Sequence, residues 1–372
     1  MLIALNLLYL IPGVVGGTET YARSLIHALA AEGKDNEYVV FLNRESADLD
    51  VTPGPNFRRV VCPFIAHRRA VRYAWEQAAL PLQLMKASPD LVHNLGYVGP
   101  LAAPCPQVVT VHDLNYLGHK GRRTAVGRRA FQFFVETSVW RADRVITISE
   151  FSRGEIVRHL NVAADKVTVV HSAGRELTDR CVGGQPEPIS EAVRNVSRPF
   201  VMAFSSLSAH KNIPRLIEAF ARISGEVPHS LVLVGHLPEN ADIRAELERA
   251  GSERVRFTGY LPDCDVRALM HDTSLFVFPS VYEGFGLPVL DAQHAGVPVA
   301  CSSAAALPEV AGDGALMFDP LSVDDMAQAL KRCLLDMDLR EKLLERGRVN
   351  ALRFSWGRAA RETLDVYASV TQ

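Results

Sequence analysis

The chain has 372 residues, 48% of them hydrophobic and 22% charged, with a formal net charge of −2. This length is too great for one compact core and predicts two domains, and the composition excludes a disordered chain. The balanced charge excludes a nucleic-acid binder. The six cysteines are scattered without the spacing of metal ligands, which predicts reduced thiols in a cytoplasmic protein.

The chain begins with an apolar run, residues 2–10, that we interpret as a buried strand. A signal peptide would carry a Lys or Arg before its apolar segment, and none precedes this run. No later run approaches the roughly 20 apolar residues that a membrane-spanning helix needs. We therefore expect a soluble protein.

Short β-branched segments alternate with helical patterns along the rest of the chain. In the first half, the predicted elements are a helix at 18–33 and strands at 37–42, 106–114, 143–149 and 166–170. The segment 171–199 contains glycines and prolines and has no clear periodicity. After it, the predicted elements are strands at 199–204, 230–235, 255–260, 274–280 and 297–302, with helices at 214–224 and near 288–296.

Such alternation is typical of βαβ units, so we predict an α/β protein with two doubly wound parallel sheets. The first domain is expected at residues 1–177, with a C-terminal helix at about 355–372 packing back on it, and the second at 195–354. Ligands of these sheets bind at the carboxyl ends of the strands. With two domains, we expect the site in the cleft between them.

The segment 283–291 reads EGFGLPVLD and joins a predicted strand to a predicted helix. Gly284 and Gly286 let the backbone approach a ligand closely, and the amides of the loop and first helical turn form an anion site. Glu283 can accept hydrogen bonds from sugar hydroxyls, and Asp291 is expected in the first turn of the helix. The same residues also suit a plain turn, with Asp291 complementing the helix dipole.

A second loop of this design precedes the helix predicted at 214–224. Asn212 is expected to cap that helix, with Pro214 in its first turn. Lys211, next to His210, then stands just before a helix N-terminus, where a cation and unpaired amides suit a diphosphate. The alternative is a solvated surface lysine.

Two more loops follow strands in the first half of the chain. Gly16 and Gly17 lead into a helix that Thr18 is expected to cap. The pattern is not GxGxxG, which argues against a dehydrogenase. His112 and Asp113 close a strand, where the histidine can contact a polar substrate or carry a proton, although a structural histidine is the alternative.

Together and in this order, these segments resemble glycosyltransferase family 4, the retaining nucleotide-sugar enzymes of the GT-B fold. The resemblance covers almost the whole chain, and its specific part runs from residue 277 to residue 319. It also includes GGTETYARSL, WEQAALP, DLVH, VVTVHDL, ADRVITISEFSR, AHKN, VRFTGYLPD and the closing FSW. WEQAALP and DLVH fit the branch that uses GDP-mannose or related donors. The implied fold is two Rossmann-like domains facing each other across a cleft, the first for the acceptor and the second for the nucleotide sugar.

The resemblance implies roles for individual residues. Glu283 is expected at the hydroxyls of the donor sugar, Asp291 on the ribose and Lys211 on the diphosphate. His112 is expected over the reacting sugar, and Gly17 near the diphosphate and acceptor. The other implied donor-binding residues are Ser206, Tyr260, Gly284, Phe285, Gly286 and Leu287.

Two positions depart from the family's pattern. Position 291 is Asp where the family usually has Glu, so a ribose contact needs a closer helix or a bridging water. Many members have an Arg before the lysine, where this chain has Ser206, and Ser205 replaces a glycine of one branch. Lys211 and the backbone amides are therefore expected to carry more of the diphosphate charge.

The resemblance predicts a retaining glycosyltransferase that transfers a hexose, mannose from GDP-mannose, to a glycan or lipid-linked saccharide in surface polysaccharide synthesis. His112, Glu283 and Lys211 would be its catalytic residues. No cofactor or metal is expected, because fixed cations and amides stabilise the leaving diphosphate. No residue is evidently placed as a nucleophile, so we expect same-face substitution. Open alternatives are rhamnose or a UDP-linked sugar as donor, a 2-epimerase-like nucleotide-sugar isomerase, and a catalytically silent sugar-nucleotide-binding subunit.

A basic and aromatic segment lies at residues 118–135, without acidic residues. Its side chains are Lys120, Arg122, Arg123, Arg128 and Arg129, followed by Phe131, Phe133 and Phe134. Such a composition predicts peripheral contact with an anionic membrane, at the inner face, where a lipid-linked acceptor would lie. The alternative is a solvated loop that leads into a core helix.

Overall fold

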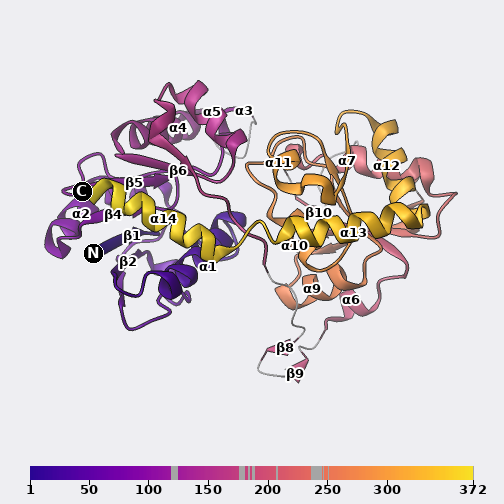
Figure 1. Cartoon of the computed structure of the whole chain (residues 1–372), viewed down its shortest axis with the longest axis horizontal. Helices are drawn as coiled ribbons and strands as arrows, with labels where there is room; N and C mark the ends of the chain where they lie inside the picture. The colour runs from indigo at the N-terminus through magenta and orange to yellow at the C-terminus, as the bar shows by residue number, and fades with distance from the viewer. Residues whose placement is uncertain are drawn as a thin grey trace. The chain divides into compact units, whose positions relative to one another are not determined.

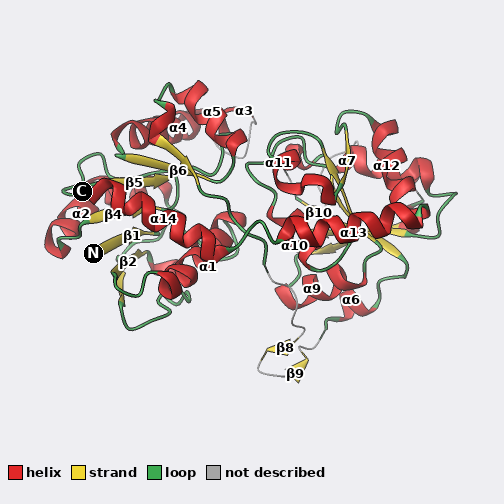
Figure 2. Ribbon diagram, viewed as in Figure 1, coloured by secondary structure: helices red, strands yellow, loops and turns green. Residues whose placement is uncertain are grey.

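The computed structural model describes residues 1–118, 125–175, 181–182, 185–186, 189–206, 208–235, 245, 247–249 and 251–371. The chain divides into two compact units, the first Met1–Ser172 with Phe354–Gln372 and the second Ala173–Arg353. Figure 1 follows the chain by colour, and Figure 2 shows helices and strands in each unit. Of the expected linker, Gly183, Gly184 and Pro188 lie outside the described residues. Within the described ranges, none of the helices has both the length and the apolar character that a bilayer-crossing segment requires.

The first unit is built on a parallel sheet whose described strands run in the order β3-β2-β1-β4-β5-β6-β7. These strands are β1 (Leu2–Asn6), β2 (Glu37–Leu42), β3 (Phe57–Val61), β4 (Leu91–Asn94), β5 (Gln107–Thr110), β6 (Arg144–Thr147) and β7 (Val167–Val169). Strand β1 pairs with β2 on one side and with β4 on the other, so the strand order reverses there. Doubly wound sheets bind ligands beyond the carboxyl ends of the strands at such a switch point.

Helices cover both faces of this sheet. They are α1 (Gly17–Glu32), α2 (Arg69–Ala87), α3 (Asn115–Gly118), α4 (Ala125–Arg141), α5 (Glu150–Leu160) and α14 (Trp356–Thr371). The buried side chains of α1 recur at helical spacing, among them Tyr21, Leu25 and Leu29. Helix α14, yellow in Figure 1, contacts α1, so the last helix of the chain completes the first unit.

The second unit repeats the same topology, with the described strands in the order β12-β11-β10-β13-β14-β15. These strands are β10 (Phe200–Ser205), β11 (Ser230–Gly235), β12 (Val255–Gly259), β13 (Leu275–Phe278), β14 (Val299–Ser302) and β15 (Leu316–Phe318). The helices are α6 (Glu191–Arg194), α7 (Ile213–Ile223), α9 (Asp263–Asp272), α10 (Leu287–His294), α11 (Leu307–Ala311), α12 (Val323–Leu335) and α13 (Met337–Ala351). A short antiparallel pair, β8 (Cys181–Val182) and β9 (Gln185–Pro186), precedes them.

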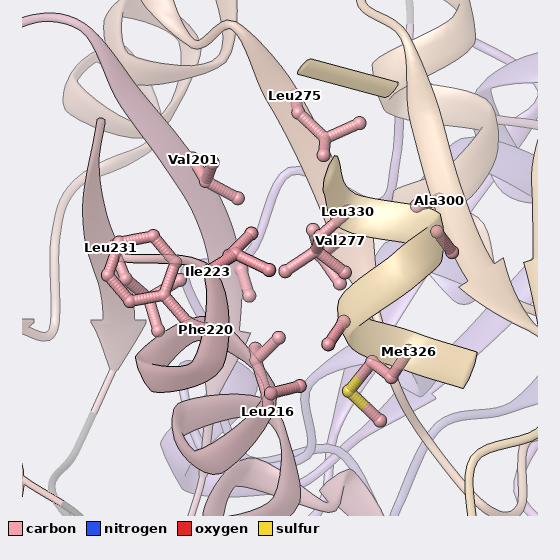
Figure 3. Packing of buried hydrophobic residues seen from close by; sticks show 14 of the residues in the cluster. Val201, Leu216, Phe220, Ile223, Leu231, Leu275, Val277, Ala300, Met326 and Leu330 are labelled. Carbon is pink, nitrogen blue, oxygen red and sulfur yellow. The ribbon is translucent and has the colours of Figure 1, made fainter. Parts of the chain in front are cut away.

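Two cores lie on opposite faces of the second sheet. Because side chains alternate along a strand, Val201 and Val277 join one core, whereas Met202 and Phe276 join the other. Figure 3 shows the first of these cores, where strand side chains meet those of α7 and α12. A sheet buried on both faces accounts for the nearly continuous apolar runs of its strands.

Five of the described strands were not among the predicted ones: the short pair β8 and β9, and the sheet strands β3, β4 and β15. Strand β3 lies at the sheet edge, carries two arginines, and has Phe57 as its one buried residue. Strand β4 contains two polar residues, His93 and Asn94, that are fully buried and hydrogen-bonded. Strand β15 has three residues. Short or polar strands lack the apolar run on which the prediction relied.

Candidate active site

Two loops meet at the switch point of the second sheet. Strand β10 pairs with β11 on one side and β13 on the other. The loop after β10 carries Lys211, and the loop after β13 carries Glu283. The topology therefore brings together two residues that are 72 positions apart in the sequence.

Lys211 and Glu283 form a close ion pair. Nζ of Lys211 donates a hydrogen bond of 2.6 Å to Oε1 of Glu283, and their side chains are 23% and 16% exposed. Nζ also lies 5.1 Å from the centroid of the Phe278 ring. The two loops are joined by a backbone hydrogen bond of 2.8 Å from Val281 to His210. The pair is thus held in place and remains accessible to a ligand.

Asn212 holds the lysine loop, although not in the predicted way. It occupies the N-cap position of α7 with a left-handed φ of 58°, but its side chain makes no cap hydrogen bond, so that prediction is wrong. Its Nδ2 instead donates to the carbonyls of Pro279 and Pro320, at 3.1 and 2.7 Å. Pro214 lies in the first turn of α7, as predicted.

The glycine loop leads directly into α10. Gly286 is the N-cap, with a φ of 118° that side chains rarely adopt, and a Cβ there would lie 2.6 Å from Leu307. Helix α10 begins at Leu287 with no side-chain cap, and the first amides of a helix have no intrahelical partner. Gly284 and Phe285 are buried. The geometry suits an anion at this helix end, and donor binding by these residues stays a prediction.

Asp291 lies in the second turn of α10 rather than in the first, because the helix begins at Leu287. Its carboxylate is 2% exposed and accepts hydrogen bonds from the backbone amide and the side chain of Arg175, at 2.6 and 3.2 Å. Burial raises the pKa of Asp291, and Arg175 counters the rise. The contact with ribose stays a prediction, and the structure adds that this carboxylate holds an arginine.

Sequence reasoning missed Arg175. Its guanidinium also donates to Oδ1 of Asp263, at 3.2 Å. The preceding residue must be small, since a Cβ on Gly174 would lie 2.9 Å from Leu290 of α10. That glycine, five residues after the end of β7, is the one signal in the sequence that the chain approaches α10 closely.

Ser206 and Tyr260 also follow strands of the second sheet. Oγ of Ser206 accepts a hydrogen bond of 3.2 Å from the amide of Ser208. Tyr260 is 72% exposed. Their roles in donor binding remain predictions.

In the first unit, His112 follows β5 and is 4% exposed. Nε2 lies 3.1 Å from the carbonyl of Leu95, which accepts a hydrogen bond, so Nε2 carries the proton and Nδ1 the lone pair. Burial lowers the pKa of His112 to about 4. The ring of Tyr21 packs edge-on against it, with 4.7 Å between the centroids. His112 is therefore a neutral imidazole at physiological pH.

Gly17 is the first residue of α1, after Gly16 with a φ of 58°. Thr18 was predicted to cap the helix, and this prediction is wrong. Its hydroxyl instead donates to the carbonyl of Val15 at 3.0 Å. Both glycines are exposed. The loop after β1 thus leaves backbone accessible at the switch point of the first sheet.

Tyr97 is a further residue that sequence reasoning missed. It follows β4, has a φ of 68°, and its ring lies 5.4 Å from that of His112. Its hydroxyl donates to Oδ1 of Asp113 at 3.3 Å. Strained backbone in a non-glycine residue is concentrated at functional sites. The sequence gives no signal for Tyr97, because the strand that precedes it, β4, was itself not predicted.

Metal-ligating side chains are not clustered in the part of the chain that the structure describes: no group of three or more His, Cys, Asp or Glu there is arranged to hold an ion. Metal independence remains a prediction.

Comparisons with known proteins agree with this arrangement. The model of "Glycosyltransferase Family 4" matches residues 15–173, and that of "Glycosyl transferases group 1" matches residues 186–350. The O-antigen chain mannosyltransferase B of Escherichia coli is 31% identical over 70% of this chain and 69% of that protein. The serotype-specific mannosyltransferase WbdA of Escherichia coli is 30% identical over 80% of this chain, which spans 39% of that relative.

The fold also resembles that of a solved structure, the sucrose-phosphate synthase of Thermosynechococcus elongatus. The TM-score is 0.75 at 20% identity, over 99% of this chain and 98% of the other. This likeness establishes the predicted α/β fold of the GT-B class. The chain belongs to glycosyltransferase family 4.

Proposed function

We propose that the protein is a retaining glycosyltransferase that transfers mannose from GDP-mannose to a glycan or lipid-linked saccharide in surface polysaccharide synthesis. The observation that carries the proposal is the Lys211–Glu283 pair at the switch point of the second sheet. Mannose as the sugar is supported by the names of two relatives, both mannosyltransferases. In this proposal the second unit binds the nucleotide sugar and the first unit the acceptor.

Lys211 and the N-terminus of α10 supply fixed positive charge. The leaving group is a nucleoside diphosphate, and negative charge builds on its β-phosphate as the bond to the sugar breaks. An ammonium and helix amides already in position stabilise this charge without solvent reorganisation. Glu283 accepts hydrogen bonds from the sugar hydroxyls and keeps Lys211 in place.

The reaction proceeds on one face of the sugar. The bond between the anomeric carbon and the diphosphate oxygen breaks while the acceptor oxygen bonds to the same carbon. The acceptor proton passes to the departing phosphate, so that GDP and the glycoside are released. His112 serves as a neutral residue whose Nδ1 accepts a hydrogen bond from a sugar hydroxyl. No metal takes part.

A panel of nucleotide sugars tests this proposal. The protein is incubated with GDP-mannose, dTDP-rhamnose, UDP-glucose and UDP-N-acetylglucosamine, and release of nucleoside diphosphate is measured. We expect the highest kcat/KM for GDP-mannose. Release of nucleoside diphosphate from another donor alone would reassign the sugar. Epimerisation of a nucleotide sugar without such release would indicate a nucleotide-sugar isomerase. No reaction with any donor would refute a transferase.

We also propose that the first unit docks on an anionic membrane through α4. Val126, Phe133 and Trp140 are 79%, 56% and 69% exposed and lie seven residues apart, which places them on one helix face. Phe131, expected in this surface, is instead buried in the core. Lys120, Arg122 and Arg123 lie outside the described residues.

Co-sedimentation with phosphatidylglycerol vesicles tests the docking proposal. We expect the variant Phe133→Ser/Trp140→Ser to remain in the supernatant while the unaltered protein sediments. Leu352→Ser is the control, since Leu352 is an apolar side chain that is 80% exposed in the second unit. Equal sedimentation of the variant and the control would refute a role for α4.

A further inference from the structure

The imidazole of His112 is held by a hydrogen bond and by two tyrosine rings. Within the described residues, the hydrogen bond runs from Nε2 to the carbonyl of Leu95. The centroids of the Tyr21 and Tyr97 rings lie 4.7 and 5.4 Å from that of the imidazole, at interplanar angles of 84° and 63°. Such edge-to-face contacts are attractive and directional. The hydrogen bond fixes the position of Nε2, so the plane of the imidazole is set by the rings that pack against it.

Tyr21 is itself held by its hydroxyl and by a second aromatic contact. It is 2% exposed, and its hydroxyl lies 3.4 Å from the hydroxyl of Thr110 on β5, which lies 2.7 Å from Nε2 of His93. Trp356, the first residue of α14, packs edge-on against Tyr21, with 5.9 Å between the centroids. Trp356 ends the FSW segment of the sequence, so this contact links that segment to the ring that touches His112.

Tyr97 occupies a backbone conformation that costs free energy. Its φ of 68° lies in the left-handed region, which residues other than glycine and asparagine rarely adopt. Its amide donates to the carbonyl of Thr110 at 3.0 Å, and its hydroxyl donates to Oδ1 of Asp113 at 3.3 Å. The ring of Phe131 on α4 packs against it, with 5.8 Å between the centroids. These contacts offset the strain and keep the ring beside His112.

The orientation of the imidazole decides what it can do in the reaction. With Nε2 bonded to a carbonyl, Nδ1 carries the lone pair that the proposed mechanism uses to accept a hydrogen bond from a sugar hydroxyl. A hydrogen bond weakens steeply when its angle departs from the preferred range. A tilt of the imidazole plane would therefore weaken the contact with the sugar, although every group that touches the substrate would still be present.

We propose that Tyr21 and Tyr97 are positioning residues, which hold the imidazole of His112 in the orientation that the transfer reaction uses. This inference rests on the proposed function, which gives His112 its contact with the sugar. Both tyrosines act through His112, and Trp356 supports the arrangement from α14 through Tyr21. The competing explanation is ordinary core packing, in which the tyrosines contribute to stability alone.

Nitrogen NMR of the histidine rings tests the orientation without any substrate. The full chain carries isotope-labelled histidine, and the variant His112→Gln identifies the signals of His112. Its titratable neighbours are Tyr21, Tyr97, His93 and Asp113. Burial raises the pKa of both tyrosines and lowers that of His93 to about 3, so these three rings keep their charge between about pH 5 and 8.

We expect the unaltered protein to show one tautomer of His112, with the proton on Nε2, because the ring is buried and its pKa is about 4. Two variants each remove one ring. Tyr97→Asn tolerates the left-handed backbone, and Tyr21→Leu keeps an apolar side chain in the core. In both variants we expect a mixture of tautomers and a higher pKa for His112, because water reaches the imidazole and its plane is no longer fixed.

Steady-state release of GDP from GDP-mannose is measured on the same variants. We expect kcat of Tyr97→Asn and Tyr21→Leu to fall about tenfold or more with KM nearly unchanged, because a misdirected group is lost from the transition state. Tyr97→Phe and Tyr21→Phe keep the rings and should retain most of kcat. Tyr73→Leu is the control, since the ring of Tyr73 stacks on that of Phe134 in the same unit, with 4.7 Å between the centroids.

An unchanged tautomer and pKa of His112 in both variants that lack a ring overturns the proposal. So does a kcat equal to that of Tyr73→Leu together with a lower Tm, because core packing then accounts for the tyrosines. Full activity of His112→Gln overturns it as well. Should Tyr21→Leu fail to fold, Tyr97→Asn decides, since Tyr97 is only partly buried.

The NMR measurement separates this inference from the proposed function. GDP release by the unaltered protein, with the signals of His112 unchanged in both variants, refutes the positioning role alone. Altered signals of His112 in the variants, with no GDP release by the unaltered protein, refute the proposed function and leave the tyrosines as the groups that orient the imidazole.

Discussion

The two switch points of the molecule share one topology and differ in charge. In the second unit, the loops carry the pairs Lys211–Glu283 and Arg175–Asp291. In the first unit, the corresponding edge carries the neutral His112 among tyrosine rings. The matching reversals of strand order give both sheets an edge at which doubly wound sheets bind ligands, and the two edges differ in their side chains. In our proposal, the edge that carries Lys211 binds the diphosphate, and the edge that carries the neutral His112 contacts a sugar.

The largest effect on activity is expected from the removal of Lys211, the cation at the edge of the second sheet. We expect Lys211→Ala to lower kcat for GDP release by about 10²–10³-fold, because a fixed cation is lost at the leaving group. The measurement is steady-state release of GDP from GDP-mannose. Lys331→Ala is the control, since Lys331 pairs with Glu226 on the exposed surface of the same unit. Equal activity of the two variants would remove Lys211 from the mechanism.

Removal of Arg175 tests the second charged pair through stability. Arg175→Met leaves the buried carboxylate of Asp291 without its cation, so we expect a loss of about 3 kcal/mol in the free energy of unfolding. Arg222→Met is the matched control, because Arg222 also bonds two acids, Glu218 and Asp324, but on the surface. Its loss should be clearly smaller, because charges on the surface stay hydrated when a partner is removed. Urea unfolding of both variants measures the difference, and equal losses would contradict a buried ion pair.

The buried neutral His112 in the first unit leads to a prediction about how the free energy of unfolding depends on pH. The pKa of His112 is about 4 in the folded chain against 6.5 for an ordinary histidine. The unfolded chain therefore binds more protons between these values, and stability falls as pH drops from about 6.5 to 4. His112 contributes roughly 3 kcal/mol to this loss.

His112→Gln should flatten that pH dependence of the free energy of unfolding. The exposed His27 provides the control variant, His27→Gln, which should keep the slope of the unaltered protein. Urea unfolding at a series of pH values from 4 to 7 gives the slopes. A slope unaffected by His112→Gln would mean that this imidazole is not buried in the neutral form.

The smallest effect is expected at position 291. Asp291 is 2% exposed and fully engaged with Arg175, so the extra methylene of Asp291→Glu overpacks the site and costs about 1–2 kcal/mol. GDP affinity, measured by calorimetric titration, should remain the same or fall slightly. A rise in affinity would show that a longer acid reaches the ribose. It would also show that Asp291 binds Arg175 in place of the ribose in the unaltered protein.

The fold was largely predictable because both sheets are buried on two faces. Apolar runs such as residues 200–205 and 275–278 stand out in a sequence, and Pro279 marks where the second of them ends. The position of His112 at a strand end followed from the same pattern. Strand β4 escaped prediction because its buried polar residues pair with distant partners that a local pattern does not show.

At the candidate active site, contacts between residues that are far apart in the sequence could not be predicted. Arg175 and Asp291 are 116 positions apart, and no spacing in the sequence signals their contact. The side chain of Asn212 bonds two carbonyls far along the chain in place of its own helix. The burial of Glu76 on α2 is likewise a tertiary property, since an acid in an amphipathic helix is ordinarily exposed.

The most direct test of the central claim follows the anomeric configuration of the product. The protein is incubated with GDP-mannose and methyl α-D-mannopyranoside in buffer with EDTA, and proton NMR monitors the reaction. Our account predicts release of GDP together with a new α-linked mannoside. A β-linked product, or a reaction that starts only after a divalent metal is added, would contradict it.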